Sequence, residues 1–213
     1  MKRHRISRRE MIEVCISQGV LVAGIASVSQ GDLLATWLQN EAKSQSPTTP
    51  EPLGPFYRKG APHVKILRQS RDPGFPLRIT GKVWNTRGDV VQNAVLDVWH
   101  ADFYGNYDIN GYKYRGKIHP EADGSYSIET IMPGHYQDRP AQHVHYLITA
   151  PGHETLVTQA YFATDPFFEG NVDKNFSKNG VVDNRENVRS VTLYEGDATA
   201  IAAITFDIVL KRS

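Results

Sequence analysis

The sequence predicts an all-β protein, an antiparallel β-sandwich with long loops that is preceded by a short helical or disordered N-terminal segment. From residue 77 onward, short stretches of alternating apolar and polar residues recur, and each ends in a turn rich in glycine, proline, asparagine or aspartate. Helical periodicity is weak after residue 50, apart from short turns near 166–178. A barrel built from the same strands is the alternative architecture.

The individual strands follow from this alternation. From Leu77 to Val83 every second residue is apolar or glycine, so one face of the first strand is suited to a core. Turn residues cluster at 85–89, 122–125, 132–134 and 151–154. The predicted strands are 77–83, 90–98, 126–130, 143–149, 156–162 and 202–210.

The first fifty residues have a different character. Residues 1–31 combine the pair Arg8-Arg9 with a modest apolar stretch, a combination that resembles a twin-arginine export signal. Polar residues interrupt the apolar stretch, so an amphipathic N-terminal helix is the alternative. Residues 32–50 are predicted to form a short helix and a proline-rich linker, which places the folded domain at 51–213. The sequence thus favours an exported, periplasmic protein over a cytoplasmic one.

Composition limits the partners of the folded body. The chain has 213 residues and a formal net charge of +1. Residues 1–31 carry five positive and two negative charges, so the rest of the chain carries a formal net charge of −2. A near-neutral body without a basic patch argues against nucleic acid as a partner, and no apolar run reaches the roughly 20 residues of a membrane helix. The single cysteine excludes a metal cage built from several thiolates and an intramolecular disulfide framework.

Four residues form a candidate metal site. His143 and His145 are two positions apart in a predicted strand, so their imidazoles point to the same face. Imidazole suits iron, copper, zinc and nickel, although two such histidines often only form hydrogen bonds. Tyr107 and Tyr136 precede them in glycine-containing loops. A phenol with its ordinary pKa of about 10 loses its proton to a hard trivalent cation, so this donor set would suit ferric iron.

These residues belong to a longer series of motifs in a fixed order. The series is Gly54-Pro55-Phe56-Tyr57, Trp99-His100-Ala101-Asp102, Gly105-Asn106-Tyr107, Pro133-Gly134-His135-Tyr136, Arg139-Pro140-Ala141, His143-Val144-His145 and Gln159-Ala160-Tyr161-Phe162. With them, the chain resembles the intradiol ring-cleavage dioxygenases over nearly all of residues 51–210. The resemblance implies a non-haem Fe(III) enzyme that cleaves a catechol-type ring with O2 to a cis,cis-muconate-type dicarboxylate. Because family members often form homodimers or heteromers, a homo-oligomer is expected.

The resemblance also implies residue roles. The metal would be held by Tyr107, Tyr136, His143 and His145. Tyr136 corresponds to the tyrosine that substrate displaces, and it would accept a substrate proton. The guanidinium of Arg139 would stabilise developing charge, and Gln159 would orient ligand or intermediate. The segment that borders the substrate pocket would contribute Pro55, Phe56 and Tyr57.

One departure from the family pattern affects Arg139. Gln142 is inserted between the Arg-Pro-Ala motif and the first histidine, and one extra residue in a regular strand turns everything before it to the opposite face. A bulge can absorb such an insertion. If the face does change, Arg115 is the alternative guanidinium, although its simpler interpretation is a solvated strand charge. The alternative function is a non-catalytic, exported β-sandwich binding module, which explains the turns and the alternation but not the two tyrosines and two histidines.

Overall fold

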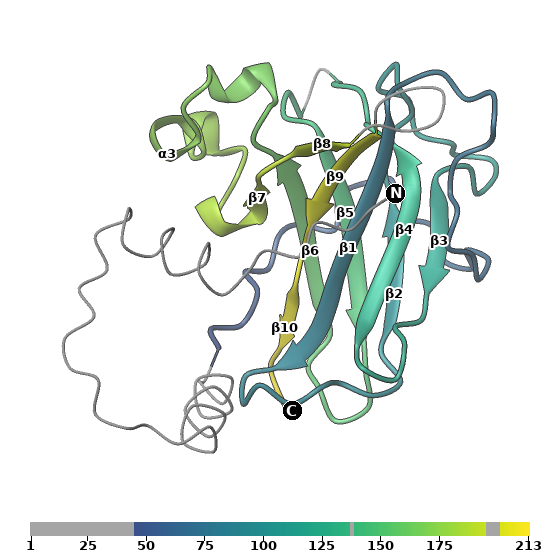
Figure 1. Ribbon diagram of the computed structural model, residues 1–213, viewed down its shortest axis with the longest axis vertical. Coiled ribbons are helices and arrows are strands. Elements are labelled where there is room, and N and C mark those ends of the chain that lie inside the picture. Colours follow the sequence, from purple (N-terminus) through teal and green to yellow (C-terminus); the bar gives the residue numbers. More distant parts are fainter. Residues whose placement is uncertain (1–44, 137–138, 195–200) are drawn as a thin grey trace, which may run out of the picture. The chain divides into compact units, whose positions relative to one another are not determined.

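The structure is a computed structural model, and it describes residues 45–136, 139–194 and 201–213. Two β-sheets pack face to face in this part of the chain, with short helical turns beside one of them (Figure 1). The predicted all-β sandwich is confirmed. The export signal expected at 1–31 and the helix expected at 33–42 lie outside the described residues. Within the described part of the chain, no helix has the length and apolar character needed to cross a bilayer.

The first sheet is built around its longest strand, β1 (Pro76–Asn85). On one side β1 pairs antiparallel with β4 (Ser125–Ile131), and on the other it pairs in parallel with β9 (Ile201–Thr205) and β10 (Ile208–Leu210). β8 (Thr192–Tyr194) extends the sheet beyond β9. The pairing is therefore mixed rather than purely antiparallel.

The predicted strand 202–210 is divided into β9 and β10 because its pairing with β1 is interrupted at Phe206 and Asp207. The carbonyl of Phe206 approaches β1 at Gly81, where an added Cβ would lie 2.1 Å from that oxygen. Only glycine permits this approach, so the glycine in the alternating pattern of β1 marks the position of the interruption.

The second sheet has the order β3-β2-β5-β6-β7. Its strands are β3 (Arg115–Ile118), β2 (Val95–Trp99), β5 (His143–Thr149), β6 (Leu156–Phe162) and β7 (Val188–Arg189). The predicted strand 90–98 was wrong at its start, because Asn93 has a positive φ of 57° and forms a turn before β2. β3 was not predicted, since Arg-Gly-Lys-Ile has no apolar alternation.

The alternation in β5 places the candidate histidines outside the sandwich. Val144, Tyr146 and Ile148 point into the core between the two sheets. His143 and His145 therefore point to the opposite, outer face of the second sheet. They are nevertheless only 3% and 2% exposed, so this outer face is covered by loops.

One layer of cover comes from the short helices η1 (Pro166–Phe168), α3 (Val172–Asn175), η2 (Lys178–Gly180) and η3 (Arg185–Asn187), which fall mostly where short turns were expected. A second apolar cluster that includes Tyr161, Phe168 and Val182 packs this segment onto the sheet. The predicted linker is also tied to the sandwich: the backbone N–H of Gln45 donates to the carbonyl of Thr86, and that of Thr48 donates to the carbonyl of Val209. The described residues before 51 are thus part of the folded unit.

Candidate metal centre

Three candidate ligand atoms converge on the outer face of the second sheet. The Tyr107 hydroxyl lies 3.1 Å from Nε2 of His145 and 3.4 Å from Nε2 of His143, and the two nitrogens are 3.1 Å apart. Two ligands about 2.1 Å from one metal ion, separated by 90–120°, lie roughly 3.0–3.6 Å apart. The observed separations therefore match a shared metal ion.

Tyr136 completes the group. Its ring centroid lies 5.6 Å from that of Tyr107 and 5.7 Å from that of His143, and its hydroxyl forms a hydrogen bond with the Tyr107 hydroxyl. The loops that carry the two tyrosines are in close backbone contact. Gly105 has a φ of +85°, and a Cβ there would lie 2.0 Å from the carbonyl oxygen of His135. Glycine at this position thus brings one tyrosine loop against the other.

The two imidazoles are held differently. Nδ1 of His143 contacts the Ala141 carbonyl at 2.7 Å, which places the proton on Nδ1 and leaves Nε2 free to act as a ligand. The ring of His145 is parallel to that of Trp99, with centroids 4.9 Å apart and an interplanar angle of 1°. Gly54 also comes so close to this ring that a Cβ there would lie 3.2 Å from Cε1 of His145. His143 is fixed by a hydrogen bond, and His145 by packing.

Burial determines the charge of these groups. It lowers the pKa of His143 to about 4 and that of His145 well below its ordinary value. Burial also raises the pKa of Tyr107, and the neighbouring Tyr136 raises it further. At neutral pH these side chains are uncharged, and their ligand atoms face one another. A bound cation would satisfy these atoms better than hydrogen bonds among them do.

The donor set fits the ferric ion that the family resemblance implies. In the described part of the chain no three His, Cys, Asp or Glu side chains gather at one point, so a metal here would require the tyrosines as ligands. Tyrosinate is an anionic oxygen ligand, and two of them offset much of a trivalent charge. The structure brings together the four predicted ligands, while metal binding itself stays a proposal.

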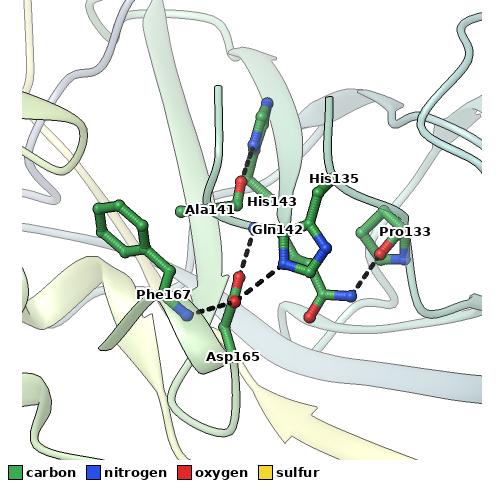
Figure 2. Close-up of polar contacts among 7 residues, drawn as sticks. All are labelled: Pro133, His135, Ala141, Gln142, His143, Asp165 and Phe167. Atoms are coloured by element: carbon green, nitrogen blue, oxygen red, sulfur yellow. Dashed lines mark hydrogen bonds and ion pairs between the residues drawn. The ribbon is translucent and has the colours of Figure 1, made fainter. Parts of the chain in front are cut away.

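The inserted Gln142 is absorbed before β5 begins. Figure 2 shows its backbone N–H donating to Oδ2 of Asp165 at 2.6 Å and its side-chain amide donating to the Pro133 carbonyl at 2.7 Å. The same carboxylate accepts from Nε2 of His135 and from the N–H of Phe167, both at 2.9 Å (Figure 2). Asp165 is 1% exposed, so this buried acceptor joins the Tyr136 loop to the start of the histidine strand.

Arg139 lies on the metal-facing side despite the insertion. Its Nη2 donates to Oε1 of Gln159 at 2.8 Å and to the Tyr161 hydroxyl at 2.7 Å. Gln159 pairs with His145, and Tyr161 pairs with His143, in the register of β5 and β6. Directly opposed residues share a face of the sheet, so Arg139 and both histidines are on the same side.

The interpretation of Arg115 as a solvated charge was wrong. Its residue is 3% exposed, and its guanidinium donates to the carbonyls of Phe56 and Asp108. The guanidinium carbon also lies 5.8 Å from the ring centroid of Tyr107. Arg115 therefore joins two loops behind the Tyr107 ring, and all three of its nitrogens have carbonyl partners.

The predicted substrate-contacting segment has one residue at the centre and two farther away. Phe56 stacks on Tyr107 with centroids 4.4 Å apart and presents its ring at 6.0 Å and 85° to Tyr136. Tyr57 instead packs on Trp99 and donates to Asp97 at 3.2 Å. Pro55 is exposed in a turn.

Asp165 and Tyr161 contribute to the site but were not predicted, although the sequence contains a signal for each. Asp165 precedes a proline, which is typical of an N-cap followed by the first helical position, and it does cap η1. Tyr161 lies two residues after Gln159 and therefore on the same face of its strand.

The fold and site define a β-sandwich with a two-histidine, two-tyrosine donor set, and comparison with known proteins identifies its family. The model of a protein family described as "Dioxygenase" matches residues 53–212. The chain belongs to the intradiol ring-cleavage dioxygenase family.

Individual relatives agree with this assignment. A chlorocatechol 1,2-dioxygenase of Cupriavidus pinatubonensis is 37% identical over 153 residues, which cover 60% of each chain. One from Rhodococcus opacus is 34% identical over 146 residues, covering 54% of this chain and 56% of the relative. Our chain thus spans somewhat more than half the length of the curated relatives that it matches.

Among solved structures, the dioxygenase domain of a dioxygenase carbohydrate-binding protein fusion from Streptomyces sp. SirexAA-E is 32% identical, with a TM-score of 0.67. The match covers 79% of this chain and 100% of that domain.

Proposed function

We propose that the protein is a non-haem Fe(III)-dependent dioxygenase that opens a catechol-type ring between its two hydroxyl-bearing carbons. Both atoms of O2 enter the product, a cis,cis-muconate-type dicarboxylate. The observation that carries the proposal is the convergence of the Tyr107 hydroxyl with Nε2 of His143 and His145, beside Tyr136. Membership of the intradiol dioxygenase family supports it.

In this proposal Tyr107, Tyr136, His143 and His145 would hold the ferric ion, which would bind the catechol and make its ring reactive towards O2. The phenolic oxygen of Tyr136 accepts one of the protons that the catechol loses on binding. Tyr136 suits this role better than Tyr107, because Tyr107 is stacked face to face against Phe56 at 4.4 Å, whereas the Tyr136 ring lies 6.0 Å from the same ring at an angle of 85°.

The remaining residues shape and polarise the site. The Phe56 ring lies against both tyrosines and supplies an apolar wall for a flat aromatic substrate. The guanidinium of Arg139 is held against Gln159 on the metal-facing side, where it stabilises negative charge that develops on substrate oxygen. The Phe56 ring and the Arg139 guanidinium are already in place before substrate binds, which lowers the free-energy cost of reorganising the site.

The names of the relatives guide the choice of substrate. They include chlorocatechol, catechol and 6-chlorohydroxyquinol 1,2-dioxygenases, so the substrate is proposed to be a catechol with small ring substituents. The test is oxygen uptake by iron-loaded protein with catechol, chlorocatechols, hydroxyquinol and protocatechuate, followed by mass spectrometry of the product formed under ¹⁸O2. We expect a dicarboxylate that contains two ¹⁸O atoms. Absence of uptake with every catechol by fully iron-loaded protein would instead favour the binding module.

Export and self-association are also proposed. Export rests on the Arg8-Arg9 pair and the apolar stretch that follows it. Cell fractionation and N-terminal sequencing of the mature chain test it, and an Arg8→Lys, Arg9→Lys variant retained in the cytoplasm would support it. Light scattering of the purified protein tests the expected homo-oligomer.

A further inference from the structure

The guanidinium of Arg139 lacks a carboxylate partner in direct contact within the described part of the chain. Its Nη2 donates instead to three neutral oxygens: those of Gln159 and Tyr161 at 2.8 and 2.7 Å, and the Val181 carbonyl at 3.3 Å. A half-buried cation bound only to neutral acceptors needs a compensating charge nearby. The question is which group supplies it.

A carboxylate that can supply this charge is that of Glu51, which contacts the same Tyr161 hydroxyl as Arg139. Glu51 is 5% exposed, and its Oε2 lies 3.5 Å from that hydroxyl. Its other oxygen accepts from the backbone N–H of Asp183 and from the side-chain amide of Asn187, both at 3.2 Å. Glu51 therefore joins its own segment to β6 and to the loop around η3.

The charges agree with this arrangement. Burial raises the pKa of Glu51 and the negative charge of Asp183 raises it further, whereas the Asn187 amide, the Asp183 N–H and, last, the positive charge of Arg139 offset part of this rise. The two ionic groups thus stabilise each other through the intervening phenol. Tyr161 is fully buried in an apolar cluster with Ala141 and Phe168, so its ring is fixed and its hydroxyl can hold a guanidinium in one position.

We propose that Tyr161 and Glu51 are positioning residues that hold the Arg139 guanidinium in place against Gln159 for ring cleavage. This inference rests on the proposed function. A positioning role predicts that the loss falls on kcat rather than on KM, because a misplaced guanidinium stabilises the transition state less while the substrate still binds.

The chain offers a matched control. Tyr161→Phe removes the hydroxyl and keeps the ring in its cluster. Tyr146→Phe removes an equally buried hydroxyl from β5, on the opposite face of the same sheet, where it packs in the core between the sheets. Glu51→Gln keeps the shape of Glu51 and removes its charge.

Steady-state kinetics of the iron-loaded variants with the best catechol test the proposal. We expect Tyr161→Phe and Glu51→Gln each to lower kcat about tenfold, the lower end of what loss of a supporting hydrogen bond costs, with KM changed less than twofold. Tyr146→Phe should retain both constants. In an Arg139→Gln background, Tyr161→Phe should cause no further loss, because the group on which it acts is gone. Equal losses in both backgrounds, or an equal loss in Tyr146→Phe, would overturn the proposal.

A second measurement does not depend on turnover. Hydrogen exchange of the iron-free protein should rise around residues 139–143 in Tyr161→Phe but not in Tyr146→Phe. If the wild type cleaves no catechol yet this exchange difference is present, the proposed function fails and the anchoring of Arg139 stands. If exchange around 139–143 is unchanged in Tyr161→Phe, the anchoring itself is wrong.

Discussion

Replacement of Gly54 by alanine tests whether the backbone beside His145 fixes that imidazole. Gly54 has a φ of +75°, and an added Cβ would lie 3.2 Å from Cε1 and 3.8 Å from Nε2 of His145. The ring cannot move freely, because it is stacked on Trp99 at a centroid distance of 4.9 Å and an interplanar angle of 1°. The left-handed backbone costs alanine about 1–2 kcal/mol. The close Cβ adds a shift of the imidazole by a few tenths of an ångström.

Gly152 provides the control for the backbone cost. Its φ is +69°, and a Cβ there would meet nothing within 4 Å. Both alanine variants should therefore lose about 1–2 kcal/mol of stability, which lowers the Tm by roughly 2–8 °C in a chain of this size. Only Gly54→Ala should also bind iron more weakly, by roughly tenfold or more.

The assays are thermal unfolding of the iron-free variants and a competition titration of iron against a chelator. Equal iron affinities in Gly54→Ala and the wild type would refute the argument that this glycine holds His145. An equal loss of iron affinity in Gly152→Ala would refute it as well, because that would assign the effect to backbone strain in general.

Three further predictions concern the metal and pH. Tyr107→Phe should abolish most of the visible tyrosinate-to-Fe(III) absorbance and most turnover. Tyr126 donates its hydroxyl to the Phe206 carbonyl in the core, so Tyr126→Phe should retain both. The reverse result would mean that the wrong tyrosine was assigned. Burial lowers the pKa of His100 to about 4, so the iron-free protein should lose about 3 kcal/mol of stability through this residue as pH falls from 6.5 to 4. Denaturant unfolding of His100→Gln should show a flatter pH dependence, and identical slopes would contradict the prediction. Removal of iron with a chelator should lower the Tm, since a ligand at 100 times its Kd stabilises by about 2.7 kcal/mol; an unchanged Tm would show that iron does not bind the folded state preferentially.

The sandwich could be predicted because most of its strands alternate clearly. β4 and β6 appear in the sequence almost as they do in the structure. β3 could not be predicted, because its pairing with β2 determines its conformation rather than its own pattern. The division between β9 and β10 depends on the approach of Phe206 to Gly81 in a distant strand, which no local pattern contains.

The candidate site shows the same division between local and distant information. The spacing of His143 and His145 predicted a shared face, but not that this face lies outside the sandwich under loops. Arg115 was misjudged because the carbonyls that bury it belong to residues 56 and 108, which only the folded chain brings to it. The effect of Gln142 likewise depended on Asp165, which lies 23 residues farther along the chain.

Crystals of the aerobically purified protein, measured on both sides of the iron absorption edge, address the identity of the centre most directly. One strong anomalous peak should lie within bonding distance of the phenolic oxygens of Tyr107 and Tyr136 and of Nε2 of His143 and His145. A peak elsewhere, or none after reconstitution with iron, would contradict the assignment of this centre.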